Sequence, residues 1–184
     1  MVYLFLADGF EETEAIAPVD ILRRMKINVT TVGVTGKVVT GSHNIKITAD
    51  ITIDEADFSD IEAAILPGGM PGTTNLGNSD ILCNLLKECA KKGKLIAALC
   101  AAPSVLGKLG LLKGRVYTCY PGFESEDFGG IYKKIPVAES RGDCTIITAW
   151  GPGAAFKFGF DVAQEISGNS TENLKEAMMM CGDE

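Results

Sequence analysis

The sequence predicts an α/β protein with a mostly parallel central sheet and helices on both faces. Short, continuously apolar segments alternate with helical patterns along the chain, and continuous apolar strands are typical of parallel sheets covered on both sides. Hydrophobic residues make up 46% of the 184 residues, which is enough for such a core. This length suits one domain over residues 1–184.

The first half of the chain alternates in this way. Apolar or β-branched segments predict strands at 2–7, 28–34 and 63–67. A helix is expected over 15–25, with Pro18 opening or kinking it. Two short strands flank Gly41-Ser42-His43-Asn44, which indicates a hairpin turn.

The second half continues the alternation. An amphipathic helix is expected over 79–92, with Gly93 as its stop signal. Strands are expected at 94–99 and 115–119, and a second hairpin around Arg141-Gly142-Asp143. The remaining helices are expected over 103–109, 154–166 and 171–180.

The composition narrows the functional classes. The formal net charge is −7, whereas a general binder of nucleic-acid backbones carries a basic face, so we expect no stable nucleic-acid partner. No run approaches the roughly 20 apolar residues that span a membrane, and residues 2–7 read as a strand rather than a leader, which predicts a cytoplasmic protein. The six cysteines form no C-x-x-C pair and there is one histidine, so we expect free thiols and no Cys/His zinc site.

Cys100 has the best location for a reactive side chain. It directly follows the apolar strand at 94–99 and precedes Ala101-Ala102-Pro103, where the next helix starts. Sites in parallel sheets form beyond the carboxyl ends of strands, and N–H groups at a helix start favour a thiolate over a thiol. A small buried core thiol is the commonest fate of a free cysteine, so position alone leaves the two interpretations even.

A glycine-rich loop at 67–72 favours the reactive interpretation. Gly68 and Gly69 follow the strand at 63–67, and glycines there let backbone N–H groups approach a ligand closely. They could supply an oxyanion hole for a carbonyl adduct on Cys100. The alternative is an ordinary strand-to-helix turn, because a Gly-Gly pair is a weak signal on its own.

Three glutamates, Glu11, Glu12 and Glu14, follow the first strand. At least two of them simply match the positive end of a helix. One that pointed inward beside a thiolate would be kept protonated and could donate a hydrogen bond to sulfur, which would lower the thiol pKa. The sequence does not choose among the three, although the position of Glu14, one turn before Pro18, is plausible.

The remaining candidates are weaker. His43 lies in the predicted hairpin turn, where a surface position is favoured over pairing with a cysteine. Cys119 ends a strand at the same sheet edge and is the most credible second thiol, but spacing gives no support to a Cys100–Cys119 disulfide. The turn Trp150-Gly151-Pro152-Gly153 either lines the site or simply begins a helix.

These residues resemble the ThiJ/PfpI superfamily, in the DJ/ThiJ branch that contains the Parkinson-disease-associated protein deglycase. The resemblance covers nearly the whole chain, and its segments are specific together rather than singly: ADGFEETEAIAPVDILRR (7–24), ILPGGMPG (65–72), LIAALCAAPSVL (95–106), TCYPG (118–122) and GPGAAFKFGFDV (151–162). It implies a flavodoxin-like sandwich, a homodimer, and Cys100 as a nucleophile on an elbow turn.

The resemblance also implies roles for the rest of the site. Glu14 would be the protonated partner of the Cys100 thiolate, and the oxyanion and substrate-binding positions would be Gly69, Ala101, Tyr120 and Gly68. Family members are described as cofactor-independent glyoxalases that convert methylglyoxal to lactate, as deglycases of early glycation adducts, and as oxidative-stress sensors or chaperones. We therefore expect no metal or cofactor, and a small dicarbonyl or a glycated protein as the partner.

Two departures from the family bear on the reaction. Ala101 stands where the protease-like branch has a histidine, which argues against peptidase activity. Tyr120 stands where the best-known animal members have a histidine, and since a phenol is a poor base near neutrality, Glu14 would carry the proton transfers. Two functions are therefore weighed: a Cys100-dependent enzyme, and a non-catalytic redox sensor or chaperone that uses oxidation of Cys100.

Overall fold

The computed structural model describes residues 1–180 and has the predicted α/β architecture. A seven-stranded sheet forms its centre, in the order β10-β11-β7-β6-β1-β2-β5. Every neighbouring pair is parallel except β10 and β11, so the expectation of a mostly parallel sheet is confirmed. The strands are β1 (Val2–Leu6), β2 (Val29–Gly33), β5 (Ile51–Thr52), β6 (Ala63–Leu66), β7 (Leu95–Leu99), β10 (Val137–Ser140) and β11 (Ile146–Ala149).

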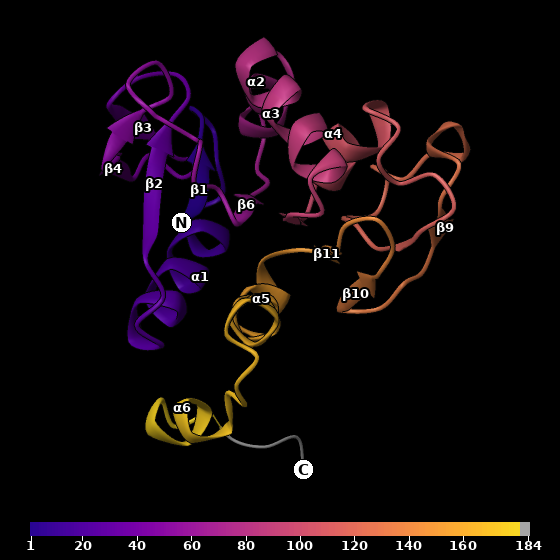
Figure 1. Ribbon diagram of the computed structural model, residues 1–184. Helices are drawn as coiled ribbons and strands as arrows, with labels where there is room; N and C mark the ends of the chain where they lie inside the picture. Colours follow the sequence, from indigo (N-terminus) through magenta and orange to yellow (C-terminus); the bar gives the residue numbers. More distant parts are fainter. Residues whose placement is uncertain (181–184) are drawn as a thin grey trace.

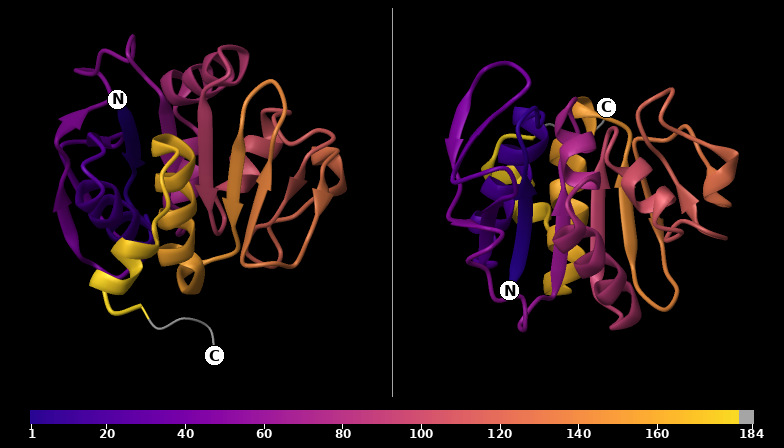
Figure 2. Two further views of the ribbon diagram at one scale, coloured as in Figure 1. Left: turned by 60° about the horizontal axis from the view of Figure 1, so that its bottom comes forward. Right: turned by 90° about the horizontal axis from the view of Figure 1, so that it is seen from above.

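Helices cover both faces of this sheet (Figures 1 and 2). One face carries α1 (Glu12–Arg24) and α5 (Ala155–Ser167), which pack against each other. The opposite face carries α2 (Gly72–Gly77), α3 (Asp80–Lys91) and α4 (Pro103–Lys108).

Two hydrophobic clusters, separated by the sheet, form the core. In β1, Leu4 and Leu6 belong to the cluster beneath α1 and α5, whereas Tyr3 and Phe5 belong to the cluster beneath α2, α3 and α4. This alternation follows from the two-residue period of a strand. The strands read as continuous apolar runs because both of their faces are covered.

Both predicted hairpins are present. β3 (Val38–Thr40) and β4 (Lys46–Thr48) pair antiparallel as a separate two-stranded sheet, and their turn contains His43. β10 and β11 form the other hairpin at the edge of the central sheet. The β3–β4 turn matters for the site, because it lies against the segment that follows β1.

The strand predicted at 115–119 is shorter in the structure, and it lies outside the central sheet. β8 (Val116–Tyr117) pairs in parallel with β9 (Ile131–Tyr132) in a small sheet of its own. The next residue, Thr118, donates its backbone N–H to Oγ1 of Thr148 at 2.9 Å. The Thr148 hydroxyl of β11 thus accepts the Thr118 N–H, which would otherwise be free to donate to a neighbouring strand.

Helix ends also differ from the sequence-based boundaries. α1 begins at Glu12 because Glu11 caps it, its carboxylate accepting the N–H of Glu14 at 2.7 Å. The last helix, α6 (Glu172–Ala177), is shorter than the predicted 171–180 and has no buried residue. Cys181 lies outside the described residues. Within residues 1–180, no helix is both long and apolar enough to cross a membrane.

Candidate active site

Cys100 lies at the carboxyl end of β7, on the turn that leads into α4. Its N–H donates to the carbonyl of Ala149 at 2.8 Å, and its own carbonyl accepts the N–H of Tyr120 at 2.8 Å. Its φ is +58°, a left-handed conformation that is uncommon for a residue with a side chain and is concentrated at functional sites. The side chain is nearly buried, at 9% exposure. The elbow geometry expected at this position is therefore present.

The backbone N–H groups of Gly69 and Ala101 both point at the Cys100 sulfur, and they lower the pKa of the thiol. Gly69 has a φ of +87° and its Cα faces the backbone of Gly9 and Glu11 so closely that a Cβ has no room. The glycine is therefore needed both for its conformation and for the close approach of the two loops. The structure brings together the amide pair that the resemblance implied.

Glu14 is the glutamate of α1 that points inward. Its side chain is fully buried, and its Oε2 accepts the N–H of Gly68 at 2.7 Å. Burial raises the pKa of this carboxyl to about 7, although the hydrogen bonds to Gly68 and Cys100 act to lower it. The other oxygen, Oε1, is buried without a hydrogen-bond partner among the described residues. A proton on Oε1 would turn this carboxyl into a hydrogen-bond donor, whereas the ionised carboxylate only accepts.

Gly68 lies between the Glu14 carboxyl and the Cys100 side chain, and because it has no side chain, only its backbone fills that space. A Cβ on this glycine would lie 2.6 Å from the Cβ of Cys100 and 2.8 Å from Oε2 of Glu14. Any larger residue would force the two groups apart. Gly68 is thus the position that allows Glu14 to approach Cys100.

The two acidic groups are strongly coupled. Burial, together with the charge and hydrogen bond of Glu14, raises the pKa of Cys100 to about 12, against the lowering effect of the Gly69 and Ala101 amides. The sequence-based expectation of a low thiol pKa therefore cannot hold while Glu14 is ionised. Like charges in contact resist a second ionisation, so the pair loses one proton readily and keeps the other.

Tyr120 forms the outer wall of the site. Its side chain is 48% exposed, and its ring packs edge-on against Phe123, with ring centroids 6.4 Å apart. A Cβ on Gly151 would lie 3.4 Å from the Tyr120 ring, so the turn after β11 does line this wall. The hydrogen bond from its N–H to the carbonyl of Cys100 fixes the backbone of Tyr120 against the Cys100 turn.

The other described cysteines do not share the hydrophobic cluster of Cys100. Cys89, Cys119 and Cys144 belong to the hydrophobic cluster on the opposite face of the sheet, and Cys83 is on α3, which covers that face. All five described cysteines are free thiols. Burial and the charge of Glu124 raise the pKa of Cys119 to about 12, which favours its protonated form near neutrality.

A sequence model of the DJ-1/PfpI family matches residues 1–165. The chain belongs to the DJ-1/PfpI family. Protein dj-1beta of Drosophila melanogaster is 35% identical over 166 residues, which is 90% of this chain and 88% of the fly protein. The Parkinson disease protein 7 homolog of Danio rerio is 35% identical over 182 residues, 98% of this chain and 96% of the fish protein. The resemblance read from the sequence is confirmed.

Solved DJ-1 structures share the whole fold. A DJ-1 superfamily protein from Salmonella typhimurium superimposes with a TM-score of 0.91 at 33% identity, covering 98% of both chains. Drosophila melanogaster DJ-1beta gives 0.89 at 32% identity, and Toxoplasma gondii DJ-1, in an oxidised form, gives 0.90 at 29% identity, each again over 98% of both chains. The predicted flavodoxin-like class is the fold of the DJ-1/PfpI family.

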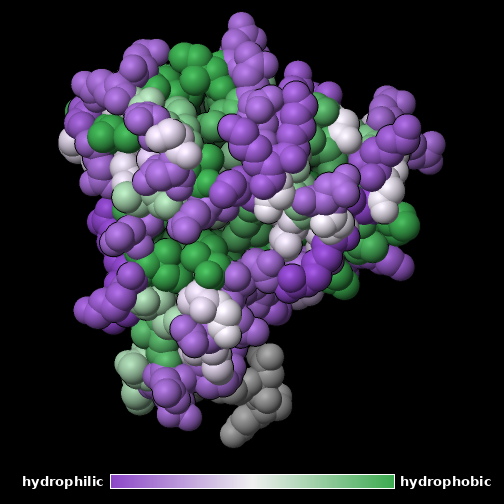
Figure 3. Space-filling model, in the orientation of Figure 1, coloured by the Kyte–Doolittle hydropathy of each residue, from purple (hydrophilic) through white to green (hydrophobic). Residues whose placement is uncertain are grey.

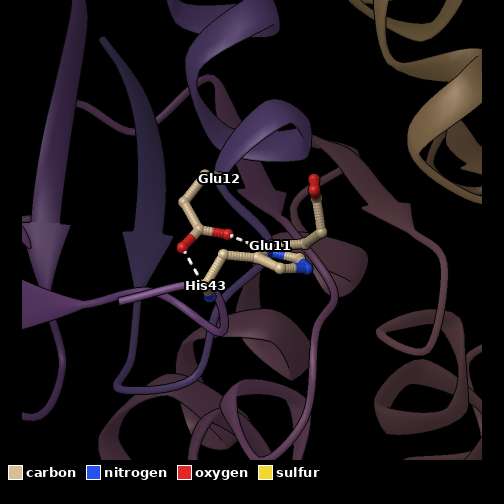
Figure 4. Close-up of side chains that lie close together, drawn as sticks. All are labelled: Glu11, Glu12 and His43. Carbon is tan, nitrogen blue, oxygen red and sulfur yellow. Dashed lines mark hydrogen bonds and ion pairs between the residues drawn. The ribbon is translucent and has the colours of Figure 1, made fainter. Parts of the chain in front are cut away.

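One acidic residue near this DJ-1/PfpI site was not singled out by sequence reasoning. Glu12 is only 8% exposed. Its carboxylate forms hydrogen bonds with the backbone N–H and the imidazole of His43 in the β3–β4 turn (Figure 4). Its partner lies 31 residues further along the chain, so no local pattern could have revealed the contact. Ligand atoms of Glu11, Glu12 and His43 lie within 4.8 Å of one another, which is the spacing of a possible metal site, but acidic groups often gather in this way without a metal.

A separate cavity of about 690 Å³ opens between α2, α4 and residues 122–128. Met70 and Phe123, the neighbours of Gly69 and Tyr120, stand at its edge, but Cys100 does not line it. The site therefore depends on the chemistry around the thiol rather than on this larger hollow.

Proposed function

We propose that this chain is a cysteine-dependent, cofactor-independent glyoxalase or deglycase that acts on methylglyoxal or on early glycation adducts, in defence against oxidative and carbonyl stress. The observation that carries the proposal is the contact between the strained, nearly buried Cys100 and the fully buried Glu14, with two amides aimed at the sulfur. Such a site offers a nucleophile, a proton carrier and an oxyanion hole together.

In the proposed reaction, the Cys100 thiolate adds to the aldehyde carbon of methylglyoxal, and the Gly69 and Ala101 amides hold the oxygen of the resulting hemithioacetal. Glu14 first gives its proton to this oxygen. As a carboxylate it then removes the proton from the former aldehyde carbon and returns it to the neighbouring ketone carbon, while the hydroxyl proton passes to the ketone oxygen. The aldehyde carbon is thereby oxidised to a thioester while the ketone is reduced to an alcohol, so no external electron acceptor is needed. Water then cleaves the thioester and releases lactate and the free thiol.

The direct test is turnover of methylglyoxal with detection of lactate. Wild-type protein should form lactate, and Cys100→Ser should lose this activity. Equal activity in the two proteins would overturn the proposal. Glycated peptides should be assayed with free methylglyoxal scavenged, since removal of the free dicarbonyl imitates repair of the adduct.

A second candidate is a non-catalytic redox sensor or chaperone, and the oxidised state of the Toxoplasma gondii relative is the observation that favours it. Here the thiolate attacks hydrogen peroxide, the O–O bond breaks, and a sulfenic acid forms with release of hydroxide; a second peroxide gives the sulfinate. The Gly69 and Ala101 amides and a protonated Glu14 would stabilise the sulfinate. After mild peroxide treatment, intact mass and peptide mapping should place a two-oxygen adduct on Cys100, and an adduct only at other thiols would reject this role.

We also propose that the protein works as a cytoplasmic homodimer. Large apolar side chains are exposed on α1 and on the β3–β4 hairpin, namely Ile16, Val38 and Ile45, which is suited to burial against a second copy. Light scattering coupled to size-exclusion chromatography should give twice the chain mass of 19.5 kDa. A monomer at micromolar concentration would contradict this part of the proposal.

A further inference from the structure

The segment at 8–12, which follows β1, lies between the β3–β4 turn and the glycine loop of the site. On the turn side, the N–H of Gly9 donates to Thr40 and the N–H of Ser42 donates to Phe10, at 2.8 and 2.7 Å. On the loop side, the N–H of Glu11 donates to the carbonyl of Gly68 at 2.9 Å. The same five residues therefore fix both the turn and the loop that presents the Gly69 amide to Cys100.

Two side chains of this segment hold the turn: Asp8, whose Oδ1 accepts the N–H of Thr40 at 2.8 Å, and Glu12. Its Oε1 accepts the N–H of His43 at 2.7 Å, and its Oε2 lies 2.8 Å from Nδ1 of His43 and 3.3 Å from Oγ of Ser42 (Figure 4). Glycine at 41 leaves the space that the carboxylate occupies. Glu12 is nearly buried, whereas the His43 ring is 71% exposed in the single chain, on the hairpin that we propose meets a second copy.

We propose that Glu12 is a positioning residue for Cys100, which acts by clamping the β3–β4 turn to the segment at 8–12, and that protonation of His43 tightens this clamp. The inference rests on Cys100 being the reactive thiol of the proposed function. It assigns a role to the only histidine of the chain that involves no contact with substrate.

The charges around the pair set the sign of the effect. The charged groups that face His43 are Glu12 and Glu11, both at the start of α1, and the hydrogen bond and charge of Glu12 raise the pKa of His43. Burial acts to raise the pKa of Glu12, but its bonds to His43 outweigh this and lower it. The paired ions therefore exist below the raised pKa of His43, and the charge attraction is lost as pH rises through it. Neutral imidazole can still donate from Nδ1, so the clamp weakens without opening.

Linkage makes this coupling measurable from both ends. If protonation of His43 favours ionisation of Cys100 through the clamp, ionisation of Cys100 raises the pKa of His43 by the same amount. Cys100→Ser, which forms no thiolate, should therefore lower that pKa by up to this amount. We expect about half a pKa unit in each direction, which is roughly a threefold change in thiolate at fixed pH. The single histidine gives one set of imidazole signals, so its titration by NMR needs no assignment.

The experiment compares the full chain with four variants. Site-resolved alkylation of Cys100 from pH 5.5 to 9 should show an inflection from His43 in wild type, and His43→Gln and Glu12→Gln should both lose it with an about threefold slower alkylation near pH 6.5. Cys100→Ser should shift the NMR pKa of His43. Lys46→Gln is the matched control, because it removes an exposed cation from the same hairpin and should leave both curves unchanged.

Two results would overturn the inference. One is an unchanged His43 pKa in Cys100→Ser together with superimposable alkylation profiles for wild type and His43→Gln. The other is coupling that persists in Glu12→Gln, because a direct field between imidazole and thiol would then be sufficient. Neither readout uses turnover, so absence of glyoxalase activity would not be confused with absence of the clamp. A Cys100 that stays un-ionised across this pH range would instead reject the proposed function.

Discussion

The proton shared between Cys100 and Glu14 decides what the site can do at the scale of single residues. Burial opposes charge on either group, and their contact opposes charge on both. Three donors remain to stabilise one negative charge on sulfur: the amides of Gly69 and Ala101 and a proton on Glu14. The reactive state we infer is a thiolate beside a carboxylic acid, with the second proton retained at neutral pH.

Alkylation of Cys100 as a function of pH tests this state. We expect an apparent pKa near or below about 7 in wild type and an increase of about one unit or more in Glu14→Gln, because burial then acts on the thiol without the acidic proton donor. The rate should be followed by mass spectrometry of the Cys100 peptide. A wild-type value close to the free-thiol 8.5 would remove the basis of both the enzymatic and the sensor role.

Glu14 also makes stability depend on pH. Its pKa in the folded protein, about 7, is above the ordinary value of 4.5, so the folded state holds the proton more tightly than the unfolded state. The stabilisation is present at low pH and is lost as pH rises from about 4.5 through about 7. A Cys100→Ser background isolates Glu14. In this background, the change in unfolding free energy caused by adding Glu14→Gln should be more favourable at pH 8 than at pH 5, by roughly 3 kcal/mol. Urea titrations at the two pH values measure it, and a pH-independent effect would contradict it.

Gly68 should tolerate no side chain. Gly68→Ala places a methyl group 2.6 Å from the Cβ of Cys100, and we expect a loss of about 1–3 kcal/mol in unfolding free energy together with altered Cys100 alkylation. Gly77→Ala is the matched control, because a Cβ there meets only a methyl of Val105 at 3.5 Å, an ordinary contact. Similar effects of the two substitutions would show that the crowding at Gly68 is not specific.

At the scale of secondary-structure elements, the N-terminal caps of α1 and α3 differ in whether the capping residue also contacts the Cys100 site. Ser79 caps α3 by accepting the N–H of Leu82 at 3.3 Å, on the face of the sheet away from Cys100. Glu11 caps α1 through the N–H of Glu14 while its own N–H binds Gly68. The first cap is structural alone, and the second also orders the site.

Replacing each cap by alanine should separate these roles. Ser79→Ala and Glu11→Ala should each cost about 1 kcal/mol in unfolding free energy, because both lose an N-terminal hydrogen bond. Only Glu11→Ala should also slow the alkylation of Cys100, since the orientation of Glu14 depends on it. Equal alkylation rates in the two variants would show that the cap of α1 does not position the carboxyl.

The elements most predictable from the sequence were those with local signals. The apolar runs gave β1, β6 and β7, and the turn residues gave both hairpins, since each pattern is contained in a few neighbouring residues. Cys100 could be placed at a strand end for the same reason. The choice of Glu14 over its neighbours needed the family resemblance, because it depends on contact with Gly68, 54 residues away. The separate β8–β9 sheet and the Glu12–His43 contact were beyond local patterns for the same physical reason.

On the scale of the whole molecule, one sheet supports both hydrophobic clusters, and we propose that residues 1–184 unfold as a single domain. Figure 3 shows that the surface in one view is mainly hydrophilic with separate apolar patches, as expected for a protein whose core lies on both sides of a buried sheet. Fluorescence of Trp150, the only tryptophan, and far-UV circular dichroism should report one coincident transition in urea. Two separated transitions would reveal independent units.

The other described cysteines lie in or beside the hydrophobic cluster on the opposite face of the sheet from the cluster that contains Cys100, although Cys119 precedes Tyr120, whose N–H binds the Cys100 carbonyl. Within residues 1–180 we therefore expect a sulfenic acid on Cys100 to find no resolving thiol in its own hydrophobic cluster. Its recovery would depend on a small external thiol such as glutathione, and in a depleted cell the residue would proceed to the sulfinate. Reduction of oxidised Cys100 is therefore expected to depend on thiols in solution rather than on another cysteine of the fold.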